Sequence, residues 1–102
     1  MGLTKLDQFT AEQNALAMMT KALGHPARIA ILQYLLSTKT CITKDLVNEL
    51  PLAQPTVSQH LKELKRTGLV EGVVKGTSVS YHINETQWKL AQQQINRLFN
   101  QL

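Results

Sequence analysis

The spacing of apolar residues along the chain predicts a series of amphipathic helices interrupted once by a pair of strands. The first predicted helix, residues 10–23, places apolar residues at three- and four-residue steps, the spacing of one helical face. These residues are Leu16, Met19 and Leu23. Thr10 followed by Gln13 resembles a capping box that opens this helix, and Gly24 is expected to end it.

Two further helices are predicted in the middle of the chain. Pro26 suits the first turn of a helix that runs to about Ser37, with His25 before it as the N-cap. Apolar residues cover more than one face of this helix, so we expect it to lie at the centre of the core. A short third helix is expected to begin with Thr43 as its cap and to stop before Pro51.

The fourth predicted helix, residues 54–67, follows the third after a tight turn, and Gly68 ends it. Its inward positions are spaced four and three apart: Val57, Leu61 and Leu64. Two helices joined in this way are typical of a helix-turn-helix motif.

A β-hairpin and a last helix complete the pattern. Residues 69–74 and 79–83 are rich in β-branched side chains and are separated by a short loop with a glycine. Asn84 and Gln87 form a second capping-box pair, which opens a final helix over residues 85–101. This helix carries a heptad-like apolar seam of Trp88, Ala91, Ile95, Leu98 and Leu102. The predicted fold is mainly α with a β-hairpin wing, a winged helix-turn-helix of order α-α-α-α-β-β-α in one domain, residues 1–102.

Composition narrows the class of protein. At 102 residues, with 43% hydrophobic and 18% charged residues, the chain is typical of one folded domain. No apolar run approaches the roughly 20 residues that cross a bilayer, and the N-terminus lacks the layout of an export signal. Since its one cysteine, Cys41, cannot form an internal disulfide, we expect a cytoplasmic protein. The formal net charge of +4 favours a polyanionic partner, although many basic proteins bind no nucleic acid.

The fourth helix carries the candidate functional surface. With its apolar positions buried, the helical rotation turns a polar and cationic face outward. Hydroxyl and amide side chains in its first half can reach base edges, while cations in its second half and at the hairpin can reach phosphates or the minor groove. The candidate DNA-binding residues are Gln54, Thr56, Ser58, Gln59, Lys62, Lys65, Arg66, Lys75 and Thr77. The alternatives are a merely solvated helix face and an ordinary surface turn.

Three segments of the chain resemble the ArsR/SmtB family of bacterial winged-helix repressors. They are residues 22–32 (ALGHPARIAIL), residues 54–62 (QPTVSQHLK), which are the most specific, and the hairpin end at residues 81–83 (YHI). In that family the second segment is the recognition helix, so the resemblance implies that its polar residues face the major groove. Arg28 falls within the family's Pro-x-Arg pattern, and we interpret it as a structural charge.

The resemblance also implies a homodimer built from the first and last helices, residues 10–23 and 85–101. Their apolar stripes agree with this, because so small a chain cannot easily cover both. The expected interface residues are Leu16, Met19, Leu23, Trp88, Ala91, Ile95 and Leu98. The implied function is a sequence-specific, double-stranded DNA-binding transcriptional repressor.

The chain departs from the family where many members bind metals. Cys41 stands alone near the third helix, and no histidine or acidic pair follows Glu85 on the last helix. Zinc and arsenic sites need three or four donors, and His25, His60 and His82 are scattered, so we expect no metal and no cofactor.

Two interpretations of Cys41 and two further functions stay open. Cys41 is either a small buried hydrophobe or, if a helix N-terminus lowers its pKa, the thiol of a redox-responsive repressor. A winged helix used only for protein contacts should show apolar or acidic residues where this chain has Gln59, Lys62 and Arg66. An enzyme is disfavoured, because the chain shows no nucleophile and base at motif spacing, no phosphate-binding glycine loop and no paired carboxylates. The effector is not indicated.

Overall fold

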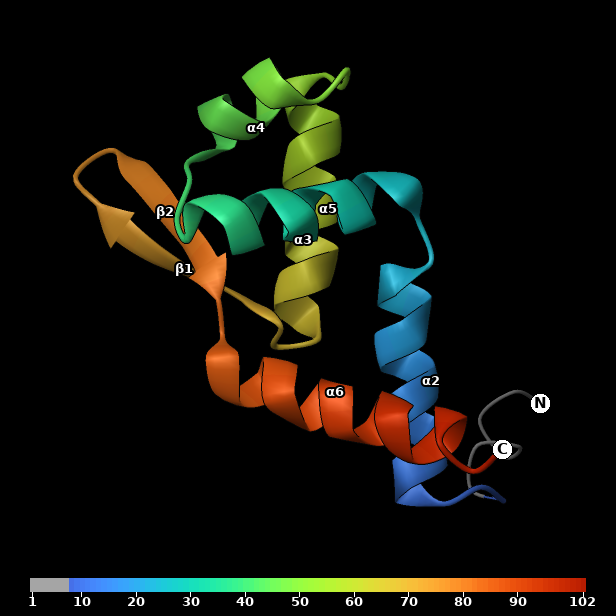
Figure 1. Ribbon diagram of the computed structural model, residues 1–102. Coiled ribbons are helices and arrows are strands. Elements are labelled where there is room, and N and C mark those ends of the chain that lie inside the picture. Colours follow the sequence, from blue (N-terminus) through green and yellow to red (C-terminus); the bar gives the residue numbers. More distant parts are fainter. Residues whose placement is uncertain (1–7) are drawn as a thin grey trace.

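Helices and one antiparallel hairpin follow each other in the predicted order in the computed structural model, which describes residues 8–102 (Figure 1). The elements are α2 (Ala11–Leu23), α3 (Pro26–Thr38), α4 (Thr43–Glu49), α5 (Gln54–Arg66), β1 (Val70–Lys75), β2 (Ser78–Ile83) and α6 (Glu85–Phe99). The winged helix-turn-helix prediction is therefore confirmed. No helix within the described residues has the length and apolar character needed to span a bilayer. The start of the segment examined for an export signal lies outside the described residues.

The first two helices begin with the predicted caps. Thr10 Oγ1 accepts a hydrogen bond from the Gln13 backbone N–H at 3.0 Å, and the Thr10 backbone N–H donates to Gln13 Oε1 at 2.9 Å. His25 caps α3, because its Nδ1 accepts from the Ala27 N–H at 3.0 Å. Both caps satisfy backbone donors that lack a partner within the helix.

Two of the other predicted caps need correction. Thr43 is not the N-cap of α4: Ile42 holds that position, and the Asp45 carboxylate accepts from the Ile42 N–H at 2.9 Å. A carboxylate in the first turn can reach back to this donor, so no side-chain cap at the N-cap position is needed. At α6, Asn84 Oδ1 accepts from the Gln87 N–H at 3.1 Å as expected. The reciprocal bond of a capping box does not form, and the Gln87 side chain lies against Gly68 instead.

The core lies where α3, α4 and α5 meet the base of the hairpin. Its fully buried side chains are Ile31, Leu35, Leu46, Val57, Leu61, Leu64 and Val70. Helix α3 supplies Leu32 to the core as well as Ile31 and Leu35, as expected of a central helix, but its apolar residues are not all covered, because Ile29 and Leu36 are 40% and 51% exposed. Helix α3 packs against α2, α5 and β2 through its other residues.

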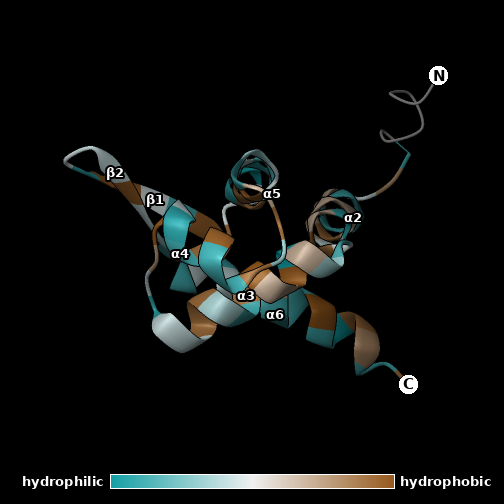
Figure 2. Ribbon diagram, turned by 90° about the horizontal axis from the view of Figure 1, so that it is seen from above, coloured by the Kyte–Doolittle hydropathy of each residue, from teal (hydrophilic) through white to brown (hydrophobic). Residues whose placement is uncertain are grey.

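The hairpin extends away from the helices (Figure 2). Its register runs from Val70 opposite Ile83 to Lys75 opposite Ser78, so β1 lies one residue later than predicted and β2 begins one residue earlier. The turn therefore consists of Gly76 and Thr77, and Gly76 has a φ of 62°, a conformation that favours glycine. Lys75 belongs to the end of β1 instead of the loop.

Candidate nucleic-acid interface

Helix α5 separates an apolar side from a polar side as its sequence predicts. Val57, Leu61 and Leu64 are all at most 1% exposed, which confirms the inward face. The positions predicted to face outward are all exposed: Gln54, Thr56, Ser58, Gln59, Lys62, Lys65 and Arg66. Basic residues in the last turn, Lys65 and Arg66, also suit the negative end of the helix dipole. The structure thus presents one continuous polar surface along α5.

The cations of this surface differ in how freely they can meet an anion. Arg66 Nη2 lies 3.5 Å from Glu63 Oε1, one turn earlier on the same helix. Among the described residues no acidic side chain pairs with Lys62, Lys65 or Lys75. Exposed pairs such as that of Arg66 contribute little energy, so this arginine can exchange its partner at small cost.

The hairpin carries the other two predicted residues. Lys75 and Thr77 flank Gly76 and are exposed. Seen from above, α5 and the hairpin lie on the same side of α3, whereas the end of α6 lies on the other (Figure 2). The elements predicted to contact DNA therefore share one side of the molecule.

Cys41 lies in the core, contrary to one of the two expectations for it. The residue is only 4% exposed, and its backbone pairs with Tyr81 of β2 through two hydrogen bonds of 3.1 and 2.7 Å. Burial, with a smaller effect from the carboxylate of Asp45, raises the pKa of the thiol from 9.0 to about 11. The expectation that a nearby helix N-terminus lowers this pKa is therefore wrong, because burial disfavours the charged thiolate.

The terminal helices pack on each other within one chain. A groove between them is lined by five of the seven predicted interface residues: Met19, Leu23, Trp88, Ala91 and Ile95. Beyond this groove the apolar stripe of α6 continues uncovered, since Leu98 and Phe99 are 53% and 72% exposed. An ion pair of 2.7 Å between Arg97 Nη1 and Glu12 Oε1 joins the two helices nearby. Whether these helices also form a dimer stays a prediction.

A contact that the sequence did not reveal joins α3 to the inner side of α5. Arg28 Nε donates to Nδ1 of His60 at 3.2 Å, and the ring of His60 lies 4.4 Å from that of His25. His60 is 8% exposed. Burial first, then the proximity of His25 and Arg28, lowers the pKa of His60 below its usual 6.5. The Pro-x-Arg pattern indicated a structural role for Arg28, but no spacing in the sequence pairs residues 32 positions apart.

The expectation that the three histidines are scattered is wrong for His25 and His60, which the packing of α3 on α5 brings together. Within residues 8–102 no group of three or more histidine, cysteine, aspartate or glutamate side chains is placed to hold a metal ion.

Comparison with known proteins gives the class to which this fold and surface belong. A helix-turn-helix domain family matches residues 23–73. The chain is 41% identical over 70 residues to the transcriptional repressor SmtB of Mycobacterium tuberculosis; the match covers 69% of this chain and 51% of SmtB. This chain thus spans about half the length of that relative. It is also 30% identical over 101 residues to the transcriptional activator HlyU of Vibrio cholerae, with 99% of this chain and 90% of HlyU covered.

Solved structures agree in fold. An ArsR-like transcriptional regulator from Rhodococcus sp. RHA1 superposes with a TM-score of 0.77 at 24% identity, over 90% of this chain and 86% of the other. The structure of HlyU from Vibrio cholerae superposes with a TM-score of 0.72 at 28% identity, over 89% and 98%. The molecule has the winged helix-turn-helix fold of these proteins. More particularly, the chain belongs to the ArsR/SmtB family of transcriptional regulators.

Proposed function

We propose that this protein is a homodimeric, sequence-specific repressor of transcription that inserts α5 into the major groove of double-stranded DNA. The observation that carries the proposal is the exposed polar and cationic face of α5, opposite a fully buried apolar face. A helix of this kind fits the major groove, where its N-terminal residues reach base edges.

Two kinds of contact are assigned to the surface. Gln54, Thr56, Ser58 and Gln59 hydrogen-bond to bases and select the sequence. Lys62, Lys65 and Arg66 contact phosphates, and Lys75 and Thr77 contact flanking DNA as a wing. A protein-docking module is disfavoured, because this surface has polar and cationic side chains where apolar or acidic side chains would be needed.

The proposed dimer uses the outward and terminal parts of α2 and α6. One chain covers only the first part of the α6 stripe and leaves Leu98 and Phe99 in solvent, so a second copy has apolar surface to bury. A two-fold pair of α5 helices then meets a near-palindromic site with half-sites about one helical turn apart. Bound in this way, the protein blocks RNA polymerase.

We also propose that the repressor works without the metal sites common in its family. The support is the donor set: Cys41 is buried without a second cysteine, and His82 pairs with Glu71 on the hairpin. His25 and His60 lie side by side, but within the described residues no third donor joins them, and the Nδ1 atoms of both already accept hydrogen bonds. Operator affinity should therefore be the same in excess zinc and in excess chelator. A tenfold or larger difference would contradict this part of the proposal.

The direction of regulation needs its own test, because one relative is named a repressor and another an activator. We expect a promoter carrying the selected operator to be transcribed less in the presence of the protein. A rise in transcription would show that the protein is an activator, and the proposed DNA-binding surface would stand.

The decisive experiment compares two single substitutions on α5. Bound fragments are first selected from genomic DNA, and affinities for a selected and a random duplex are then measured over a range of salt concentrations. Gln59→Ala should lose affinity for the selected site only, whereas Lys62→Ala should weaken both duplexes alike and reduce the salt slope by about one unit.

Lys89→Ala is the matched control. It removes the same charge as Lys62→Ala from an exposed position on α6, so its affinity should fall much less. Equal losses for Lys62→Ala and Lys89→Ala would show that only net charge matters. Absence of salt-sensitive binding would favour the protein-contact alternative.

A further inference from the structure

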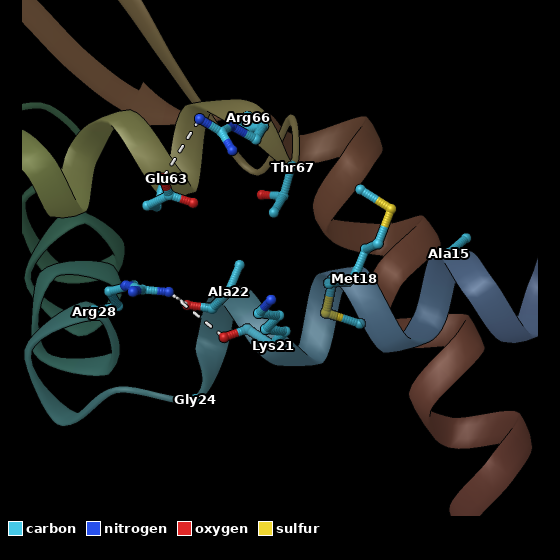
Figure 3. A pocket seen from close by; sticks show the side chains of 10 residues that line it. Ala15, Met18, Lys21, Ala22, Gly24, Arg28, Glu63, Arg66 and Thr67 are labelled. Carbon is cyan, nitrogen blue, oxygen red and sulfur yellow. Dashed lines mark hydrogen bonds and ion pairs between the residues drawn. The ribbon is translucent and has the colours of Figure 1, made fainter. Parts of the chain in front are cut away.

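The guanidinium group of one residue on α3 contacts both α2 and α5. Arg28 Nη1 donates to the carbonyl oxygen of Ala22 at 2.9 Å and reaches that of Lys21 at 3.5 Å, both at the end of α2 (Figure 3). Its Nε donates to His60 Nδ1 on the inner side of α5 at 3.2 Å. Arg28, on α3, therefore ties α5 to the end of α2.

This arrangement requires a neutral histidine. An arginine has only donors, so His60 Nδ1 accepts and carries no proton. His25 lies beside this contact, and its Nδ1 accepts from the Ala27 N–H as the cap of α3. A proton on His60 Nδ1 would set two donors against each other and would place a second positive charge beside Arg28.

The surroundings offer little compensation for such a charge. His25 and Arg28 of α3 face His60, and the groove beside Arg28 adds Lys21 of α2 together with Arg66 and a single acid, Glu63, of α5. Glu63 is already paired with Arg66 (Figure 3). The other elements packed on α5 carry charged residues too: Lys44, Asp45 and Glu49 on α4, and Glu71 and Lys75 on β1. None of these pairs with His60 within the described residues.

We propose that Arg28 and His60 are positioning residues for α5, and that protonation of His60 releases α5 and weakens operator binding in mild acid. The proposal rests on the DNA-binding role of α5 proposed above. The groove beside Arg28, about 630 Å³, gives the guanidinium room to swing away from the ring. Because α2 is also one of the predicted dimer helices, loss of the tie changes the placement of the two α5 helices relative to one another.

The proposal predicts a change in operator affinity on acidification that is opposite to the change expected from net charge alone. A proton on His60 adds a positive charge to the formal net charge of +4, which by itself strengthens binding to any DNA. Release of α5 weakens binding only where base contacts matter. Specific affinity should therefore fall on acidification while affinity for random DNA rises or stays constant.

The experiment measures both affinities at pH 7.5 and pH 5.5 at one ionic strength. For the wild type we expect a loss of about tenfold or more for the selected operator, within the usual range of coupling between sites. His60→Asn should keep its affinity at pH 5.5, because Asn Oδ1 can accept from Arg28 in place of Nδ1 and cannot be protonated at these pH values. His82→Gln removes a histidine from the exposed hairpin, where His82 Nε2 lies 2.9 Å from Glu71 Oε2, and should retain the wild-type loss.

The outcomes separate the two proposals. No specific binding at pH 7.5 refutes the function itself. Specific binding that acid does not weaken, or an equal acid loss in His60→Asn, refutes the proton-sensitive tie alone. Should His60→Asn fail to fold, the ¹⁵N shifts of wild-type His60 decide: Nδ1 must be unprotonated at pH 7.5 and must gain its proton over the same pH range in which operator affinity falls.

Discussion

The buried thiol of Cys41 should react far more slowly than an ordinary cysteine. A pKa of about 11 in place of 9.0 makes the thiolate fraction at neutral pH about one hundredfold smaller, and the thiolate is the reactive form. At 4% exposure the sulfur must also wait for local opening before a reagent can reach it. Because the backbone of Cys41 is paired with Tyr81, such an opening detaches this segment from β2.

The assay is the rate of labelling by an aromatic disulfide reagent at pH 7.5. We expect the native protein to react at least one hundredfold more slowly than the same protein in urea, where the thiol is exposed and its pKa is ordinary. The Cys41→Ser variant has no thiol, so it gives the background signal of the assay. The reasoning fails if the native and unfolded rates differ by less than tenfold. If, in addition, oxidation abolishes operator binding by the wild type but not by Cys41→Ser, the result would support a redox-responsive repressor.

Three further predictions concern stability. Leu61→Ala leaves a cavity under α5 and should lower the free energy of unfolding by about 3–5 kcal/mol, which urea denaturation measures; a loss below 1 kcal/mol would mean that the core closes around the gap. Because the pKa of His60 is lowered in the folded protein, the unfolded chain binds protons more readily, so the free energy of unfolding should fall as the pH drops below about 6.5. His60→Asn should show a smaller fall. A melting temperature of the wild type that does not change over this pH range would contradict the assignment. Gly76→Ala should cost about 1–2 kcal/mol, because a φ of 62° is strained for alanine even though open space surrounds the site; an unchanged denaturation midpoint would show that the turn can relax.

Much of the fold follows from local patterns. Apolar spacing and caps placed every helix of the described chain to within a residue or two, because periodicity and capping act over only a few positions. The outward face of α5 was predictable for the same reason, since burial of Val57, Leu61 and Leu64 fixes the direction of the other side chains.

Contacts between distant segments were decided by the tertiary structure alone. The burial of Cys41 depends on Tyr81, 40 positions later, and that burial reversed the expected direction of its pKa shift. The tie between Arg28 and His60 likewise joins two helices that no local pattern relates. The sequence by itself determined the elements and the polar face of α5, because these depend on neighbouring residues. Packing determined which ionisable groups are desolvated and which donors meet which acceptors, because both depend on how the helices and the hairpin come together in space.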